Sequence, residues 1–163
     1  MTYRLASMSP SILALTLFLL VLPVVFVVFA LYSAPFVLIP AGFLLLIYAW
    51  IWLWFRPSKF AIRADVVEIV WPLRRLEIAR RSISSVRLID RAALRREVGR
   101  SMRVGAGGLG GGFGWLWTTR RGLVRMYVSR LDGFVWIERG AEQPWLITPD
   151  RPDAFVQALA PRG

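Results

Sequence analysis

Cysteine and histidine are both absent from this sequence of 163 residues. Without cysteine the chain has no disulfide, no thiolate metal site and no cysteine nucleophile. Without histidine it also lacks the most frequent general base and the most frequent metal ligand. These absences exclude the commonest designs of hydrolytic and metal-dependent active sites. We therefore expect no enzyme activity, no catalytic residue, no metal and no cofactor.

Charge is absent from one third of the chain. No charged residue occurs between Leu5 and Phe55, whereas the part that follows carries all 10 acidic residues and all but one of the 21 basic residues. The sequence thus divides into an apolar segment, residues 1–58, and a charged segment, residues 59–163. The second segment is long enough to bury a core of its own.

The apolar segment contains two stretches long enough to cross a membrane. A bilayer core of about 30 Å requires about 20 apolar residues in a helix. Residues 11–32 and 36–55 each supply such a stretch, with Ser33, Ala34 and Pro35 between them. Proline disfavours helical geometry in the residue before it, which favours a turn at this point. The sequence predicts a hairpin of two transmembrane helices.

The flanks of this hairpin indicate its orientation. Aromatic residues concentrate at the end of the second stretch, as expected near lipid headgroups, and Arg56, Lys59 and Arg63 follow directly. Arg4 flanks the other end, and the connecting turn is uncharged. Because basic flanks stay in the cytoplasm, we expect a multi-pass protein of the cell inner membrane with both termini cytoplasmic.

The apolar segment has two other interpretations. Ala30 and Ala34 could form the small-residue cleavage region of a signal peptide that precedes a single span. The first stretch is longer than a signal core of about 7–15 residues, and Pro35 is a poor neighbour for cleavage. A helical hairpin buried in a soluble protein is disfavoured because no other part of the chain is large enough to cover it.

Short alternating runs of apolar and polar residues follow from Lys59 onward, which is typical of strands with one buried face. We expect about seven strands, within residues 60–62, 66–71, 73–79, 86–90, 115–129, 134–138 and 145–148. Residues 92–98 could form two helical turns. Residues 131–133, Leu-Asp-Gly, read as a hairpin turn between two consecutive strands.

A final helix is predicted over residues 154–160. Asp150 can cap its free amides, and Asp153 complements the positive end of its dipole. Phe155, Val156 and Leu159 share one stripe that can pack on a sheet. The fold class is therefore a membrane-anchored α+β protein, with a helical hairpin, an antiparallel β-barrel or sandwich and a C-terminal helix.

The order of these elements, and four segments of the C-terminal half, carry a resemblance to a known family. These segments are residues 108–114, 124–128, 135–137 and 145–156, the last running from a strand through Thr-Pro-Asp into a helix. In these respects the sequence resembles the bacterial pleckstrin-homology (PH)-like membrane proteins. The resemblance implies two nearly orthogonal antiparallel sheets with the terminal helix at an open corner. It also implies a binding, scaffolding or membrane-assembly role, but not phosphoinositide recognition, since residues 63–65 are too short for a long basic loop.

A glycine tract, residues 105–114, contains the dinucleotide-binding pattern G-x-G-x-x-G at Gly105, Gly107 and Gly110. That motif requires a strand before it and a helix after it, whose N-terminus holds the pyrophosphate. Residues 115–119, Trp-Leu-Trp-Thr-Thr, favour a strand instead. We therefore expect a flexible loop or a bend between the sheets at this position.

Ten arginines lie between Arg74 and Arg103, against only three acidic residues. Anionic lipid headgroups, nucleic acid and ordinary solvent exposure are the three interpretations. An anchored domain already lies within reach of lipid, whereas nucleic acid would require the basic face to point away from the membrane. Solvent exposure stays the default, and lipid is the favoured partner. The candidate contact residues for anionic lipid or a protein partner are Arg74, Arg75, Arg80 and Arg81.

The leading functional hypothesis is a membrane-anchored binding or scaffolding module. The alternative is an accessory subunit of a larger membrane complex, such as a transporter or an envelope enzyme. A third class, an enzyme, would need Lys59 or a carboxylate to activate one of the serines at 82, 84 and 85, or a pocket shared by Asp150 and Asp153.

Overall fold

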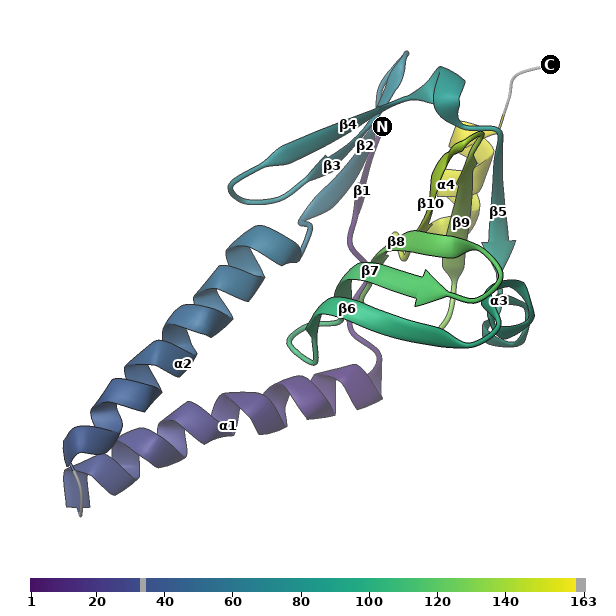
Figure 1. The fold of residues 1–163 in the computed structure, drawn as a ribbon. Coiled ribbons are helices and arrows are strands. Elements are labelled where there is room, and N and C mark those ends of the chain that lie inside the picture. Colours follow the sequence, from purple (N-terminus) through teal and green to yellow (C-terminus); the bar gives the residue numbers. More distant parts are fainter. Residues whose placement is uncertain (33–34, 161–163) are drawn as a thin grey trace.

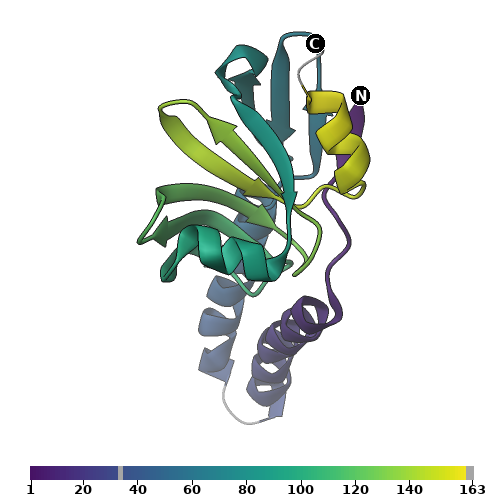
Figure 2. The ribbon, with the colours of Figure 1, turned by 90° about the vertical axis from the view of Figure 1, so that its right-hand side faces the viewer.

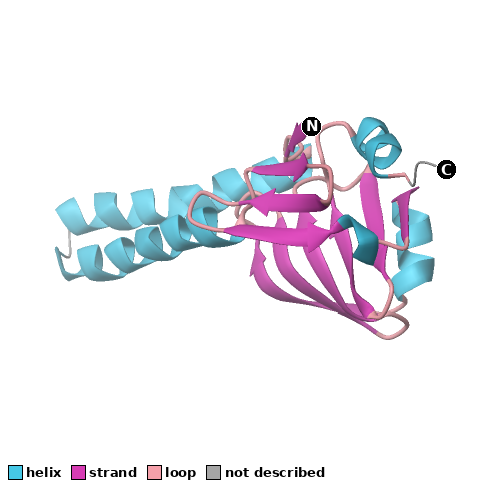
Figure 3. Cartoon of the chain, turned by 90° about the horizontal axis from the view of Figure 1, so that it is seen from above, coloured by secondary structure: helices cyan, strands magenta, loops and turns pink. Residues whose placement is uncertain are grey.

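The structure is a computed structural model that describes residues 1–32 and 35–160. Two long helices project from one end of a domain built of two β-sheets and short helices (Figure 1, Figure 3). Figure 2 shows the amino terminus within the sheet domain, close to the last helix. The chain therefore starts in the domain, leaves it through the two helices and returns to it.

The two long helices coincide with the two apolar stretches. They are α1 (Pro10–Tyr32) and α2 (Leu38–Trp50), the second preceded by the 3₁₀ turn η1 (Pro35–Val37) and continued by the π-helical turn η2 (Ile51–Phe55). Both are long and apolar enough to cross a membrane, and most of their side chains are exposed. The predicted helices are confirmed. Ser33 and Ala34, the centre of the predicted turn, lie outside the described residues.

The smaller sheet has four antiparallel strands in the order β1-β2-β3-β4. They are β1 (Thr2–Arg4), β2 (Lys59–Ile62), β3 (Val66–Val70) and β4 (Arg75–Ala79). The sequence assigns residues 1–58 to the hairpin, but β1 belongs to the sheet. Tyr3 pairs with Phe60 and is buried, and the amino-terminal nitrogen donates to the carbonyl of Ile62 at 2.8 Å. This pairing brings both ends of the helical hairpin together.

The larger sheet has six strands in the order β5-β9-β10-β8-β7-β6. They are β5 (Ser85–Ile89), β6 (Ser101–Gly107), β7 (Gly112–Thr118), β8 (Gly122–Val128), β9 (Phe134–Arg139) and β10 (Glu142–Ile147). The described residues thus form ten strands in two open sheets. The expectation of about seven strands is too low, because β1 and β6 were missed and residues 115–129 form two strands. The closed-barrel alternative is wrong.

Strand β10 pairs with β9 in antiparallel fashion and with β8 in parallel. The predicted hairpin at residues 131–133 is therefore wrong, since β10 lies between β8 and β9. Residues 145–147 on β10 are buried, with Trp145 and Ile147 in the core between the sheets and Leu146 in the core on the opposite face. A strand that is apolar on both faces belongs in the interior of a sheet, which explains the insertion.

Two short helices cover the larger sheet. Helix α3 (Arg91–Val98) begins at Asp90, whose Oδ1 accepts from the backbone amide of Ala93 at 2.6 Å. The N-cap position of helix α4 (Pro152–Leu159) is occupied by Arg151, whose side chain makes no capping hydrogen bond. Asp150 instead accepts from the amide of Arg151 at 3.0 Å, so its predicted capping role is wrong. The predicted apolar stripe is confirmed at Phe155 and Leu159, which are buried.

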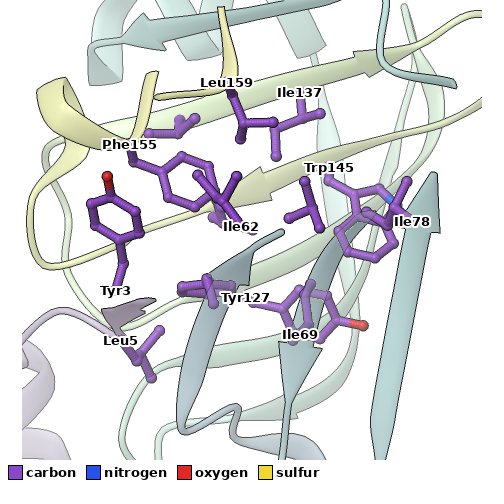
Figure 4. Close-up of a cluster of buried hydrophobic side chains, with 14 of the residues drawn as sticks. Tyr3, Leu5, Ile62, Ile69, Ile78, Tyr127, Ile137, Trp145, Phe155 and Leu159 are labelled. Atoms are coloured by element: carbon purple, nitrogen blue, oxygen red, sulfur yellow. The ribbon is translucent and has the colours of Figure 1, made fainter. Parts of the chain in front are cut away.

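Apolar side chains form one core between the sheets and a second between the larger sheet and α3. Figure 4 shows the first core, in which Phe155 of α4 lies near Tyr3 of β1 and Leu159 of α4 lies near Ile137 of β9, while Tyr127 and Trp145 lie near Ile69 and Ile78. Tyr3 also donates to the carbonyl of Ala154 at 3.2 Å. Because α4 packs on β1, the amino terminus is an integral part of the domain.

Candidate functional site

The four predicted arginines are divided between the two ends of β4. Arg74 and Arg75 stand at its start, whereas Arg80 and Arg81 form the 3₁₀ turn η3 (Arg80–Ser82) beyond its end. A strand of five residues at about 3.3 Å per residue separates the two pairs by roughly 16 Å. The structure therefore does not bring the four residues into one patch.

Arg80 has a structural partner. Its Nη2 donates to the carbonyl of Ala158 at 3.1 Å, which ties η3 to the end of α4. The side chain also lines an open depression of about 540 Å³ together with Met1, Arg63 and Ala64. Arg75 and Arg81 are exposed.

Arg74 packs against aromatic residues at the end of α2. Its guanidinium carbon lies 4.2 Å from the ring centre of Trp71 and 5.7 Å from that of Trp54. The indole nitrogen of Trp71 donates to the carbonyl of Phe55 at 2.9 Å, and Phe55 is the last residue of η2. These contacts fix Arg74 at the junction of the smaller sheet and the second helix.

Two further arginines lie over Trp145 in the larger sheet. The guanidinium carbon of Arg125, on β8, is 5.8 Å from the centre of the Trp145 ring, and that of Arg139, at the end of β9, is 5.3 Å from it. Guanidinium groups at such distances are attracted to the face of an indole. The central position of β10 thus places one tryptophan between two arginines from neighbouring strands.

Tyr127 joins the two groups of aromatic residues. Its ring lies edge-on to Trp71 at 5.3 Å and to Trp145 at 5.9 Å. Burial raises the pKa of Tyr127, while the nearby positive charges of Arg125 and Arg74 oppose that rise. Both cations therefore act on the same phenol. We call the six residues Trp71, Arg74, Arg125, Tyr127, Arg139 and Trp145 the arginine–aromatic cluster.

The arginine–aromatic cluster has more hydrogen-bond donors than acceptors. The Nε atoms of Arg74 and Arg139 and the indole nitrogen of Trp145 are buried and have no acceptor among the described residues. Leaving a buried donor unpaired costs about 1–3 kcal/mol. Such groups are unusual, because the large majority of buried side-chain polar atoms are paired.

Positive charge in the cluster is only partly compensated. Glu142 forms an ion pair with Arg139, whereas Arg74 and Arg125 have no carboxylate partner among residues 1–32 and 35–160. Burial lowers the pKa of Arg139, Glu142 opposes that shift, and Arg125 adds to it. Arg139 thus has a carboxylate partner, whereas Arg74 and Arg125 have none in this part of the chain.

Sequence reasoning found one of the three arginines. Arg74 lies in the dense arginine stretch of residues 74–103, whereas Arg125 and Arg139 lie outside it. Their signal was weaker: Arg125 lies between apolar strand residues in Val-Arg-Met-Tyr, and Arg139 ends the run Trp-Ile-Glu-Arg. The pairing of β10 between β8 and β9 was needed to bring them together.

An exposed apolar surface lies elsewhere on the larger sheet. It is formed by Met102 and Val104 on β6, Trp115 and Trp117 on β7, and Leu123 on β8. Trp117 is 53% exposed and Met102 is 60% exposed. Single exposed apolar residues are ordinary, but a contiguous group with two tryptophans is typical of an interaction surface.

The glycine tract forms the β6–β7 hairpin, and its turn contacts both long helices. A Cβ on Gly108 would lie 2.9 Å from Leu19 of α1, and one on Gly110 would lie 3.4 Å from Trp52 of η2. Strand β7 follows the turn, so the helix that a dinucleotide site requires is missing here. The tract is an ordered hairpin, and the expectation of a flexible loop is wrong.

Thr16 of α1 binds this turn. Its hydroxyl lies 2.9 Å from the carbonyl of Gly108 and accepts from the amide of Gly110 at 2.9 Å. The side chain is 3% exposed and also lies 2.7 Å from the carbonyl of Ile12. The turn is therefore fastened to the first helix by its own backbone.

The described residues contain no group of three or more acidic side chains that could hold a metal ion. Asp150 and Asp153 lie at the start of α4 and are exposed. No shared pocket is found for this pair among the described cavities. The arrangement offers cations and aromatic rings for binding an anion.

Comparison with known proteins identifies a family for the charged segment. No curated protein and no solved structure matches the chain. The sequence model of the family described as bacterial PH domain matches residues 58–163, which comprise β2 to β10 and all the residues of the arginine–aromatic cluster. The chain therefore belongs to the bacterial PH domain family.

Proposed function

We propose that this protein is a binding module that two transmembrane helices anchor to the cytoplasmic face of the cell membrane. The observation that carries this proposal is the pairing of β1 with β2. Since β1 precedes α1 and β2 follows η2, both outer ends of the hairpin lie on one side of any membrane that the helices cross. Cleavage after Ala30 or Ala34 would remove β1 from its sheet, which argues against the signal-peptide alternative.

The exposed surface of the two helices supports membrane insertion. Phe18 is 73% exposed and Leu46 is 70% exposed, and many other large apolar side chains of α1 and α2 are at least 40% exposed. Each fully exposed side chain of this kind costs about 1.5–3 kcal/mol in water relative to an apolar environment. A bilayer provides that environment for both helices at once.

The charged flanks support the cytoplasmic orientation. Arg4, Arg56 and Lys59 all lie at the sheet end of the helices. Trp50 and Trp54 stack with ring centres 5.1 Å apart at the same end, where amphipathic rings favour the headgroup region. We infer that the start of β4 lies near the headgroups, and that Leu73, which is 61% exposed, faces them.

The four predicted arginines then have different roles. Arg74 and Arg75 lie at the start of β4, next to η2, and would contact anionic lipid. Arg80 and Arg81 lie beyond the far end of β4. A flat membrane that touches Arg74 and Arg75 would therefore not reach them. We propose that this second pair is available to a protein partner.

An accessory subunit of a larger membrane complex is the second candidate. The exposed apolar surface at Trp115 and Trp117 favours it, because a second protein could cover that surface. Purification of the intact protein in mild detergent tests this candidate. One partner at fixed stoichiometry, lost on Trp117→Ser, would support the subunit role, whereas its absence favours the lipid-facing module.

The anchoring proposal is tested by fractionation of cells that express the chain with a C-terminal reporter active only in the cytoplasm. The expected result is reporter activity in the membrane fraction that resists alkaline extraction. A protein that stays monodisperse in buffer without detergent, or a reporter that is inactive because it lies outside the cytoplasm, would contradict the proposal.

A further inference from the structure

We propose that strand β6 and the exposed apolar surface beside it bind an extended segment of a protein partner, which joins the larger sheet as an additional strand. The bound segment carries apolar side chains on one face and acidic side chains on the other. This inference names a partner for the binding module proposed above. It rests on the proposed anchoring only where a second copy and the bilayer are excluded as occupants.

Strand β6 has a free edge. It is the last strand of the larger sheet and pairs only with β7 in the described parts of the chain (Figure 1). The opposite edge strand, β5, is contacted by α4. Strand β4, at the edge of the smaller sheet, carries Arg75 and Glu77, and such charges discourage pairing. Strand β6 is seven residues long, is exposed over most of its length and carries one charge, so its edge is open to a partner.

Hydrogen bonds at the two ends of the β6–β7 hairpin indicate which backbone groups of β6 face outward. The amide of Gly108 donates across the hairpin at 3.1 Å, and the carbonyl of Arg100 accepts across it at 3.0 Å. The register between these bonds is unbroken. In an antiparallel pair, residues that bond to the partner strand alternate with residues whose backbone groups point away from it. The amides and carbonyls that point away from β7 therefore belong to Ser101, Arg103 and Gly105.

One face of β6 continues the core between the sheets. Phe113 of β7 is buried in that core, and Trp115 and Trp117 follow it on the same face. Met102 and Val104 of β6 lie opposite Trp117 and Trp115 in the register. All four side chains are exposed, so the apolar face extends beyond the part that the smaller sheet covers. A strand added at β6 would place its own apolar side chains beside Met102 and Val104.

The other face of β6 favours acidic side chains in the partner. Arg103 lies on this face, is exposed and has no ion pair among residues 1–32 and 35–160. Opposite charges on directly paired strand residues stabilise a sheet. Arg100, directly before the strand, is also exposed, and the whole chain has a formal net charge of +11. An acidic segment would therefore be attracted to this edge from a distance as well as in contact.

The direction of β6 argues against a second copy and against the bilayer as occupants. A Cβ on Gly110, in the turn after β6, would lie 3.0 Å from Arg56, so this end of the strand faces the proposed membrane. Met102 lies near the other end, roughly 16 Å from Gly107 along the strand, which takes it away from the lipid. Twofold symmetry would pair two β6 strands in antiparallel fashion. The helices of the second copy would then point away from the membrane that holds the first.

The test uses the full-length protein purified in a neutral detergent and a fluorescent peptide of alternating valine and glutamate. Fluorescence anisotropy measures binding, and we expect it to be saturable. Three comparison peptides contain lysine in place of glutamate, the same residues in two blocks, or methylated nitrogens at alternate amides. Each should bind much more weakly, because charge, alternation and backbone pairing are removed in turn.

Matched variants assign the binding to β6. Arg103→Glu should reverse the preference, so that the lysine peptide binds better than the glutamate peptide. Arg75→Glu makes the same change of charge on β4 and should leave the preference unaltered. Trp117→Ser should weaken the affinity about tenfold, since an aromatic contact is lost. A cooperative unfolding transition without peptide shows that each variant is folded, and Met102→Ser provides a second variant if Trp117→Ser does not fold.

Several outcomes would overturn the proposal. Absence of saturable binding, or equal binding of the methylated peptide, would exclude the addition of a strand. Equal binding of the lysine peptide would exclude the selection of charge. A dimer in sedimentation analysis that Trp117→Ser dissociates would assign the surface to a second copy, and loss of peptide binding in phosphatidylcholine nanodiscs would assign it to the bilayer. None of these outcomes decides whether the helices anchor the protein, which the fractionation experiment tests separately.

Discussion

At the scale of residues, arginine serves two different purposes in this protein. Arg87 and Arg121 are compensated by Glu97, which connects α3 to β5 and to the turn between β7 and β8. Arg74 and Arg125 face aromatic rings instead. The sequence shows that arginine is abundant, but only the pairing of strands decides which guanidinium groups meet a carboxylate. This is why Arg74 was anticipated and Arg125 and Arg139 were not.

Glu97 allows a test by pH. Burial alone would raise its pKa, but hydrogen bonds and charge from Arg121 and Arg87 outweigh that effect and hold the pKa below its ordinary value of 4.5. A depressed folded-state pKa adds stability above the unfolded-state pKa, and that stability is lost as pH falls through the folded-state value. We predict that Glu97→Gln lowers the free energy of unfolding by about 1 kcal/mol at pH 7.

Denaturant titrations at several pH values measure this effect. The difference between the two proteins should shrink as pH falls below about 4. Asp132→Asn is the matched control, because Asp132 pairs with Arg130 but its side chain is 83% exposed, and it should change stability little at any pH. A Glu97→Gln difference that persists unchanged at pH 3 would contradict the assignment.

At the scale of elements, the helices were predictable and parts of the sheets were not. Stretches of about 20 apolar residues leave little alternative to a helix. Strand β1 has only three residues, and its partner lies more than 50 residues away, so no local pattern reveals it. Strand β6 is also concealed, because its residues 101–107 include two glycines and are mostly exposed. The parallel pairing of β8 with β10 could not be predicted, because it depends on which strands are buried on both faces.

Thr16 provides a test of the link between the first helix and the β6–β7 turn. Thr16→Val keeps the shape of the side chain but removes the oxygen that accepts from the amide of Gly110. A buried amide without a partner should cost about 1–3 kcal/mol. Thermal unfolding in detergent and hydrogen exchange at residues 108–111 measure the loss. Thr2→Val, at an exposed position, is the control and should leave both unchanged.

Gly105 tests the close approach of β6 and β7. Its φ is +136°, and a Cβ there would clash with the backbone carbonyl of Phe113. Gly105→Ala should therefore destabilise the protein by about 1–3 kcal/mol. Gly107→Ala, two residues along the same strand with nothing within 4 Å of its Cβ, should change the free energy of unfolding by less than about 0.5 kcal/mol. Equal effects of the two substitutions in denaturant titrations would show that the approach is not close.

At the scale of the whole molecule, the helices and the sheets depend on one another. Residues before the first helix complete the smaller sheet, and the β6–β7 turn packs against both helices. The family and the general architecture were anticipated from the order of elements and the strand-to-helix junction at residues 145–156. The mutual contacts were not, since they join segments that are distant in sequence. An anchor built into the domain in this way would hold the arginine–aromatic cluster at a fixed height above the membrane.

The absence of cysteine makes the central claim directly measurable, because any introduced thiol is unique. Thr2→Cys, Tyr32→Cys and Asp132→Cys place single thiols at exposed positions in β1, at the end of α1 and in the loop after β8. The measurement is labelling of each variant in spheroplasts with a maleimide that does not cross membranes. We predict that Tyr32→Cys is labelled in intact spheroplasts, whereas Thr2→Cys and Asp132→Cys are labelled only after permeabilisation. Labelling of Thr2→Cys or Asp132→Cys in intact spheroplasts would contradict the two-helix anchor with a cytoplasmic domain.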